Sequence, residues 1–357
     1  MFSHYKNNRN RFLFGDLIGV FLPCLTLLII AMALYRVHWI ASLPVIDLKG
    51  KPSAYLFIRT GSDFREVQRL LGSSGLTDHV SDFTWLAHRK KYSEKIKPGR
   101  YKIVDGMSNN DLLNMLRSGK QEPVRITFQN IRTPEDLAGK IGKSLETDSS
   151  QLIRFFGDSS FLQQFGLTEE TLFIYFIPDT YEFLWNTSGV GLFRRMEREF
   201  RKFWNEDRRR QADSLRLTIP EVVTLASIVE KETNKNDEKS RIAGVYFNRL
   251  QKHIPLQADP TVIFAWKDYT IRRVLNKHLQ IISPYNTYHF AGLPPGPICI
   301  PSVASVNAVL CPEHHDFIYF CAKADLSGYH AFARTLSEHS MNANKYQQAL
   351  NGLNIKR

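Results

Sequence analysis

A long apolar segment lies close to the N-terminus of the chain. Residues 17–35 read LIGVFLPCLTLLIIAMALY, which is nineteen residues without a charged side chain. Asp16 precedes this run and Arg36 follows it. A helix of about 20 apolar residues crosses the roughly 30 Å hydrocarbon core of a bilayer. The pattern therefore predicts a transmembrane helix over residues 17–36.

Basic residues before this segment predict its orientation. Lys6, Arg9 and Arg11 lie on its N-terminal side, and the cytoplasmic flank of a transmembrane helix carries an excess of Lys and Arg. We therefore expect a single-pass protein of the inner membrane, with residues 1–16 in the cytoplasm and the rest of the chain outside it. The alternative is a cleaved signal peptide, which has a shorter apolar core and a small-residue cleavage site.

Strand-like and helix-like patterns alternate over the next 65 or so residues. The segments are a strand at 55–60, helices at 62–75 and 80–91, a strand at 97–104 and a helix at 107–120. Ser62 is the expected N-cap of the first helix, and Gly119 is expected to end the last one. This order predicts a small β-α-α-β-α unit that ends near a boundary between residues 122 and 132.

The pattern beyond this boundary indicates a larger α+β region. The expected elements are a strand at 124–129, helices from Pro134 onward, helices at 221–232 and 241–250, and a final helix through Tyr346. The sequence GLPPGP at 292–297 contains three prolines and two glycines, which predicts a rigid loop. Rigidly held loops often line functional sites. The predicted fold class is α+β with an N-terminal transmembrane helix.

Composition supports folded domains rather than a disordered or repeat protein. The chain has 357 residues, of which 43% are hydrophobic and 23% charged, enough for two or three domains. Its four cysteines, at positions 24, 299, 311 and 321, form no CxxC pair. We therefore expect free cysteines, with neither a zinc ribbon nor a disulfide framework.

The net charge of +12 suggests that the part of the chain outside the cytoplasm binds an anionic partner. Basic surfaces attract nucleic acid, anionic lipid or acidic polymers, and nucleic acid is not expected beyond a membrane anchor. Much of the charge lies in residues 194–210, which also carry apolar residues at helical spacing. That segment predicts an amphipathic helix with a solvated basic face.

Candidate chemistry lies at the C-terminal end of the apolar helix predicted over 221–232. This helix ends in Glu230, Lys231 and Glu232. Residues two apart on a helix lie about 200° apart, so the two carboxylates cannot form one paired site. Both lie on shoulders of the apolar face, and the helical wheel does not choose between them. The position along the helix favours Glu232, which is nearer the C-terminal end. The helix dipole disfavours further negative charge at that end and raises the pKa of a carboxyl there.

Two interpretations of these glutamates follow. A carboxyl kept protonated in a dry pocket is an acid catalyst. Alternatively, both glutamates pair on the surface with Lys231, Lys235 or Arg241, and the segment is an ordinary helix end.

Eight sequence motifs follow one another in order. They are KPGRYKI, IPDTYEF, ASIVEKET, FNRL, LQADPTVIFA, YNTY, GLPPGPI and GYHAFARTLSEH. This set resembles the YceG-like endolytic murein transglycosylases, the MltG family, over nearly the whole chain. One difference is that the sequence after GPI reads Cys299-Ile300-Pro301-Ser302, where a more polar Asn-Pro-Gly ending is expected. The resemblance implies a LysM-like subdomain over 50–122 and a YceG-like catalytic domain over 123–350.

The resemblance also implies an activity. Glu232, followed by Thr233, matches the catalytic glutamate of that family, which uses no cofactor and no metal. The implied reaction cuts the β-1,4 bond between N-acetylmuramic acid and N-acetylglucosamine in nascent peptidoglycan strands, leaves a 1,6-anhydro end and terminates elongation. One carboxyl serves as acid and then as base, so Glu230 is expected to be structural. The implied partners are glycan strands, the synthases of the elongation or division machinery, and inner-membrane lipid.

Substrate-binding candidates follow from the same motifs. They are Thr233, Asn248, Asp259, Tyr285, Asn286, Thr287 and Tyr288. The YNTY hydroxyls and amide suit sugar hydrogen bonding, although such a tetrapeptide is also ordinary turn chemistry. Asp259 also fits a helix cap.

The histidines give no sign of a metal site, and two other functions are possible. The run His314-His315-Asp316 lacks metal-ligand spacing, and His330 and His339 are expected to make local hydrogen bonds. Rival functions are a non-catalytic wall-binding scaffold and a hydrolase. A hydrolase needs a second carboxylate to activate water, for which Glu230, Asp237 and Asp259 are the candidates.

Overall fold

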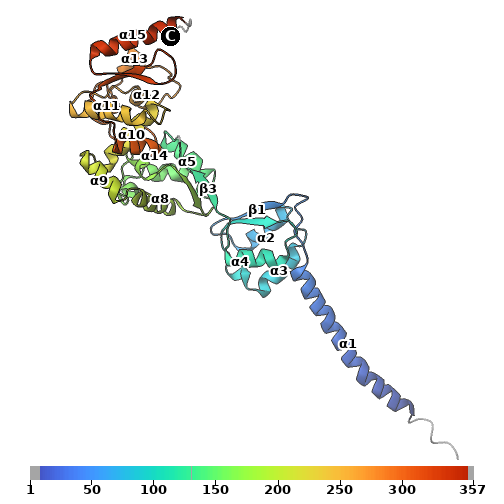
Figure 1. Cartoon of the computed structure of the whole chain (residues 1–357). Helices are drawn as coiled ribbons and strands as arrows, with labels where there is room; N and C mark the ends of the chain where they lie inside the picture. Colours follow the sequence, from blue (N-terminus) through green and yellow to red (C-terminus); the bar gives the residue numbers. More distant parts are fainter. Residues whose placement is uncertain (1–8, 130, 353–357) are drawn as a thin grey trace, which may run out of the picture. The chain divides into compact units, whose positions relative to one another are not determined.

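The computed structural model describes residues 9–129 and 131–352 (Figure 1). The described chain divides into two compact units. The N-terminal unit runs through Pro123 and includes the short segment Leu184–Asn186. The C-terminal unit contains Val124–Phe183 and the chain from Thr187 onward. Each unit has its own buried core.

The N-terminal unit begins with one long helix, α1 (Arg9–Ser42) (Figure 1). Within the described residues, its segment Phe21–Ser42 is the single helix long and apolar enough to cross a membrane. Side chains from Phe21 to Val37 are exposed, so this segment is not a core helix of the unit. The end of α1 packs into the unit, where Ile40 is buried and its carbonyl accepts a hydrogen bond from Asn109 at 3.0 Å.

The rest of the N-terminal unit has the predicted β-α-α-β-α order. Its elements are β1 (Ser53–Ile58), α2 (Phe64–Ser73), α3 (Val80–Arg89), the 3-10 turn η1 (Tyr92–Glu94), β2 (Gly99–Val104) and α4 (Asn109–Ser118). The strands pair antiparallel, with Ser53 opposite Val104 and Ile58 opposite Gly99. Alternate strand residues such as Leu56 and Tyr101 are buried with the apolar sides of the helices, as the period of two in the strands requires.

The helix ends of this unit test the predicted caps. Gly119 follows α4 with φ +72°, the left-handed conformation that glycine adopts most readily. The predicted N-cap of α2 was wrong by one residue. Asp63 rather than Ser62 is the cap, because its carboxylate accepts the backbone N–H of Glu66 at 2.8 Å.

The C-terminal unit combines two small antiparallel strand pairs with many helices. Its elements are β3 (Val124–Thr127), α5 (Pro134–Gly142), α6 (Ser149–Phe156), α7 (Ser159–Gln163), η2 (Leu172–Tyr175), β4 (Thr180–Phe183), α8 (Gly189–Phe203), α9 (Glu206–Ser214), α10 (Ile219–Glu232), α11 (Lys239–Gln251), α12 (Asp259–Trp266), α13 (Asn276–Leu279), α14 (Val303–Leu310), β5 (Tyr319–Ala322), β6 (His330–Ala333) and α15 (Leu336–Gly352). Strand β3 pairs with β4, and β5 pairs with β6. The mixed α+β class predicted from the sequence is therefore confirmed.

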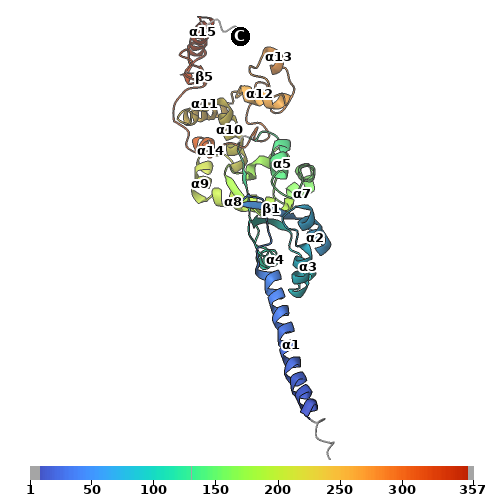
Figure 2. The same ribbon diagram turned by 90° about the vertical axis from the view of Figure 1, so that its right-hand side faces the viewer.

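Helix α10 is the central helix of this unit and lies beside α11 and α14 in both views (Figure 2). Thr218 and Glu221 form a capping box at its N-terminus, which satisfies two backbone N–H groups there. All residues from Val222 to Val229 are buried. The helix stops after Glu232 because Thr233 adopts an extended conformation. Glu230 and Glu232 therefore lie in the last turn of a buried helix, and both residues are half-buried.

The basic segment 194–210 was predicted to form one amphipathic helix, but it is divided between α8, which ends at Phe203, and α9, which begins at Glu206. Helix α8 is amphipathic, as predicted. Phe193 and Met196 are buried on one side. The other side is solvated, and an exposed ion pair there joins Arg201 to Glu197 at 2.8 Å. All four cysteines lie in the described part of the chain and are free thiols, as predicted.

Candidate active site

The two glutamates at the end of α10 face different surroundings. Glu232, the last helical residue, lines a cavity of about 390 Å³ in the C-terminal unit. Glu230 makes its contacts with Lys239 and with the N-terminal end of α14. As their spacing predicted, the two carboxyls do not form a paired site.

Side chains from distant parts of the C-terminal unit line the Glu232 cavity. They are Glu232 from α10, Tyr246 and Arg249 from α11, Leu256, Gln257 and Asp259 around the start of α12, Tyr288, Tyr319 and Phe320 from β5, and Leu336 and His339 from α15. The lining combines aromatic rings with a few polar groups that converge on one space. Such a lining suits a ligand with flat apolar faces and a polar rim.

Burial keeps the carboxyl of Glu232 partly protonated at neutral pH. The pKa of Glu232 is raised to about 7, chiefly by removal from water; a hydrogen bond from Tyr246 opposes this shift, and the charge of Asp259 adds to it. The hydroxyl of Tyr246 donates that bond to Oε1. A carboxyl with this pKa can both donate and accept a proton near pH 7. Burial is the largest cause of this shift.

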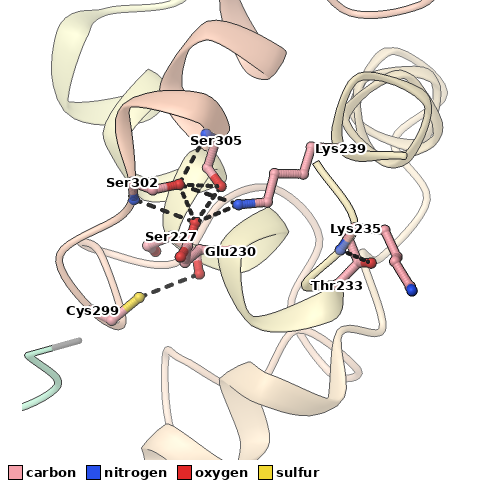
Figure 3. Close-up of polar contacts among 8 residues, drawn as sticks. All are labelled: Ser227, Glu230, Thr233, Lys235, Lys239, Cys299, Ser302 and Ser305. Atoms are coloured by element: carbon pink, nitrogen blue, oxygen red, sulfur yellow. Dashed lines mark hydrogen bonds and ion pairs between the residues drawn. The ribbon is translucent and has the colours of Figure 1, made fainter. Parts of the chain in front are cut away.

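The pKa of Glu230 is lowered, whereas that of Glu232 is raised, and the contacts of Glu230 explain the difference (Figure 3). Its Oε2 accepts hydrogen bonds from Lys239 Nζ at 2.9 Å and from the hydroxyls of Ser302 and Ser305. The side chains are 19% exposed for Glu230 and 5% for Lys239. Burial by itself raises the pKa of Glu230, but the hydrogen bonds from the serines and Lys239 lower it overall. Glu230 is therefore an ionised residue in a buried ion pair.

The alternative that both glutamates pair on the surface is wrong. It assigned Lys231, Lys235 or Arg241 as partners. Arg241 pairs instead with Glu313 at 2.9 Å, and the ammonium of Lys235 lies 4.8 Å from the ring centroid of Tyr329. The true partner of Glu230, Lys239, lies at the start of the next helix and is buried.

Asp259 is a second carboxyl in the Glu232 cavity. Tyr288 donates a hydrogen bond to its Oδ1 at 2.6 Å. Burial raises the pKa of Asp259, and the Tyr288 bond lowers it. Asp259 is the first residue of α12, and its N-cap is Ala258. The predicted capping role is therefore not what this side chain does.

Arg249 provides the cation of the cavity wall. Its guanidinium donates to the carbonyls of Pro255 and Ile318, each at 2.9 Å, and to the side chain of Gln257. It is 6% exposed and lies 5.5 Å from the ring centroid of Tyr319. These contacts fix a positive charge at the cavity wall.

Of the seven predicted substrate-binding residues, Asp259 and Tyr288 line the cavity. Tyr285 packs against Phe264 with ring centroids 4.7 Å apart. The remaining four are Thr233, Asn248, Asn286 and Thr287, and their polar groups are used within the fold.

Three of these residues form hydrogen bonds with backbone groups of other segments. Asn286 donates to the carbonyl of Ile281 at 2.8 Å, and the Thr287 hydroxyl accepts the Ala258 N–H at 3.0 Å. The Asn248 amide donates to the carbonyl of His315 at 2.7 Å. Their direct contact with a ligand stays a prediction.

Some residues of the cavity were missed by the sequence analysis, above all Tyr246 and Arg249. They lie three apart on α11, a spacing that places side chains on the same helix face, and this was the available signal. Tyr319 and His339 were also missed as lining residues. Their rings stack with centroids 5.2 Å apart, a contact between a strand and a helix that no local pattern encodes.

In the described part of the chain, the predicted local hydrogen bond is present for His330 but not for His339. His330 makes the expected local bond, with its Nδ1 2.9 Å from a carboxylate oxygen of Glu238. Nδ1 of His339 is buried without a hydrogen-bond partner among the described residues, so the prediction for His339 was wrong. His315 directs Nε2 toward the carbonyl of Arg241 at 2.9 Å.

The GLPPGP loop packs closely where the sequence predicted rigidity. A Cβ on Gly296 would lie 2.0 Å from the carbonyl oxygen of Glu170, so only glycine fits there. The loop then returns to α10, where the backbone N–H of Ile298 donates to the hydroxyl of Ser227 at 3.0 Å. The loop is thereby tied to the helix that carries Glu232.

Comparison with known proteins agrees with this architecture. The chain is 28% identical over 322 residues to the endolytic murein transglycosylase of Bacillus subtilis, an alignment that covers 86% of this chain and 88% of the relative. It is also 28% identical over 337 residues to the endolytic murein transglycosylase of Streptococcus pneumoniae D39. That alignment covers 84% of this chain and 60% of the relative.

A solved structure and a family model identify the fold. A YceG-like protein of Listeria monocytogenes superimposes with a TM-score of 0.54 at 26% identity, covering 82% of this chain and 99% of the other. The sequence model of the YceG-like family matches residues 56–345. This chain therefore belongs to the YceG-like family.

Proposed function

We propose that the chain is an endolytic murein transglycosylase with Glu232 as its catalytic acid and base. The relatives reported above carry that name. The observation that carries the proposal is the environment of one carboxyl. Glu232 lines a cavity and has a pKa of about 7, whereas the pKa of nearby Glu230 is lowered.

The proposed reaction begins with protonated Glu232. Its carboxyl donates a proton to the oxygen that links N-acetylmuramic acid to N-acetylglucosamine, and the bond from that oxygen to C1 of the muramoyl sugar breaks. The hydroxyl of Tyr246 donates to Oε1 of Glu232, which leaves Oε2 to carry the proton. The same Tyr246 bond stabilises the carboxylate that forms.

The second step closes a ring. Glu232, now ionised, takes the proton of the muramoyl C6 hydroxyl while that oxygen bonds to C1. The product ends in a 1,6-anhydro sugar, and no water is consumed. A single carboxyl therefore suffices for both proton transfers, and ionised Glu230 has no proton to donate.

The decisive experiment is Glu232→Gln in the full chain, with mass spectrometry of the muropeptides released from purified glycan strands. We expect 1,6-anhydro products to fall by about 10²–10⁴-fold, while binding of the strands persists. Unchanged 1,6-anhydro product from this variant would refute the role of Glu232. A wild-type protein that binds strands without cutting them would instead support the non-catalytic scaffold.

Asp259 provides the basis for a second candidate, a hydrolase. It lies in the same cavity as Glu232, and a hydrolase needs a second carboxylate to activate water or act as nucleophile. The products decide between the two, because hydrolysis gives a reducing end 18 mass units heavier than the anhydro end, one water. In a hydrolase, Asp259→Asn would abolish activity.

We also propose the placement of this activity in the cell. The exposed apolar segment Phe21–Ser42 would anchor the protein in the inner membrane, with the N-terminus cytoplasmic and the C-terminal unit outside. Residues 50–122 would be LysM-like and 123–350 the catalytic domain. Synthases of the elongation or division machinery would then be the partners that supply nascent strands.

A further inference from the structure

A second cavity, of about 170 Å³, borders the same two helices as the Glu232 cavity. Lys231 of α10 and Pro260 of α12 line it. Each is next in sequence to a residue of the first cavity, Glu232 and Asp259 respectively. Because consecutive residues of a helix face different directions, the end of α10 and the start of α12 separate two neighbouring cavities.

Two cations face this second cavity. They are Arg132, which precedes α5, and Lys231, and both are half-buried. Within residues 9–129 and 131–352 neither forms an ion pair. The guanidinium of Arg132 lies 5.3 Å from the ring centroid of Tyr269. Burial raises the pKa of the Cys299 thiol to about 12, and both cations oppose this shift, which places both near one buried group.

The nearby carboxylates in the described part of the chain form no ion pair with these two cations. Glu230 acts on the same Cys299 thiol, but it is paired with Lys239. Glu135 and Asp136, at the start of α5, are close enough to act on Tyr269. Both are exposed and neither lines the cavity, so solvent and salt screen them. Half-buried cations without a partner are unfavourable, and an anionic ligand would relieve that cost.

The rest of the lining defines the kind of anion. It is apolar and consists of Pro260, Ile263, Phe264, Ile271 and Ile298 beside the Tyr269 ring. A small inorganic ion would leave this surface uncovered. A carboxylate carried on a short carbon chain would satisfy the cations and also cover the apolar wall.

We propose that the second cavity binds a carboxylate of the acidic peptide carried by the muramoyl sugar of the substrate. This inference rests on the proposed function, since it places a peptide beside the bond that Glu232 would cut. In such a strand the sugars are N-acetylated and the lactyl groups are in amide bonds. The free carboxylates are therefore those of the peptides.

The test measures binding rather than cleavage. Full-length Glu232→Gln protein in detergent micelles is titrated with peptide-bearing glycan strands and with the same strands after conversion of their carboxyls to amides. We expect binding to the acidic strands to be about tenfold or more tighter, as for a charge-assisted hydrogen bond in a partly dry site. Adding Arg132→Gln or Lys231→Gln should remove most of this preference.

Arg273→Gln is the matched control, because Arg273 is exposed and lines neither cavity. It removes one positive charge and should leave the preference unchanged. A preference that is absent, that survives in Arg132→Gln and Lys231→Gln, or that falls equally in Arg273→Gln overturns the proposal. A melting curve shows that each variant is folded, and having two cation variants protects against the failure of one.

The same measurement separates this inference from the proposed function. If the wild-type protein does not cut strands but the charge preference depends on Arg132 and Lys231, transglycosylase activity fails and the peptide site stands. If anhydro products form but amidated strands bind as tightly as acidic ones, the activity stands and the peptide site fails.

Discussion

Glu230 and Glu232 lie two residues apart in one helix, yet their pKa values are shifted in opposite directions. The difference comes from what each carboxyl meets. Glu230 receives hydrogen bonds from Lys239, Ser302 and Ser305. Glu232 receives one from Tyr246 and has no cation partner in the described chain. Partners favour ionisation, whereas burial without a cation favours the proton.

A stability measurement at the residue scale follows from the raised pKa. Glu232 has a pKa near its ordinary 4.5 when unfolded and about 7 when folded. Its protonated form is therefore favoured by folding, and the wild-type free energy of unfolding should fall as pH rises from about 4.5 to above 7. Glu232→Gln lacks this titration and should become relatively more stable over that window, by about 1–3 kcal/mol at pH 8.

Thermal or denaturant unfolding of both proteins between pH 4 and pH 8.5 checks this. Other titrating groups are common to the two proteins and cancel in the difference. A difference in stability that stays constant with pH would show that Glu232 ionises normally.

At the scale of elements, α10 is held at both ends. Its N-terminus has the capping box of Thr218 and Glu221. Its C-terminus is joined through Glu230 to α11 and to the start of α14. Glu232 lies half a turn beyond this ion pair. The cluster therefore fixes the direction in which the last residue of the helix points.

A double-mutant cycle tests the interaction between Glu230 and Lys239. Glu230→Gln and Lys239→Met each leave a charged or polar partner buried, and each should cost about 3–5 kcal/mol of unfolding free energy. The double variant should cost less than the sum, with a coupling of about 1–3 kcal/mol. The matched control is the exposed pair of Glu197 and Arg201 on α8, whose cycle should give less than about 1 kcal/mol. Equal coupling in both cycles would contradict a special role for Glu230.

At the scale of the whole molecule, two successive parts of α1 have different surroundings. Its segment from Phe21 to Val37 is exposed, whereas Ile40 is buried in the N-terminal unit and its carbonyl is bonded to Asn109. The apolar surface that would meet a membrane and the surface that stabilises the fold therefore lie in successive parts of one helix.

Two truncations separate membrane anchoring from stabilisation of the N-terminal unit. A chain that starts at His38 should leave the membrane fraction and keep its N-terminal unit folded, because Ile40 is retained. A chain that starts at Leu43 loses a buried Ile and should lower the stability of that unit by about 2–5 kcal/mol. Membrane flotation and denaturant unfolding measure the two effects. Flotation of the His38 chain with membranes would show that the span is not the anchor.

Local rules made much of the architecture predictable. The uncharged run of residues 17–35 identifies the candidate span by length, and the periods of strands and helices predicted the β-α-α-β-α unit and α10. The spacing of Glu230 and Glu232 excluded a paired site. The errors were local too, as at Ser62, where a neighbouring aspartate is the cap.

The sequence by itself determined the class, the family motifs and the fact that the two glutamates face apart, because these depend on chain-local geometry and composition. Only the tertiary structure decided which carboxyl is dry and which is paired. Tyr246, Asp259 and His339 line the cavity that Glu232 faces, while Ser302 and Ser305, at the start of α14, donate hydrogen bonds to Glu230. The pKa of a carboxyl depends on the solvent and charges around it, and distant parts of the chain supply both.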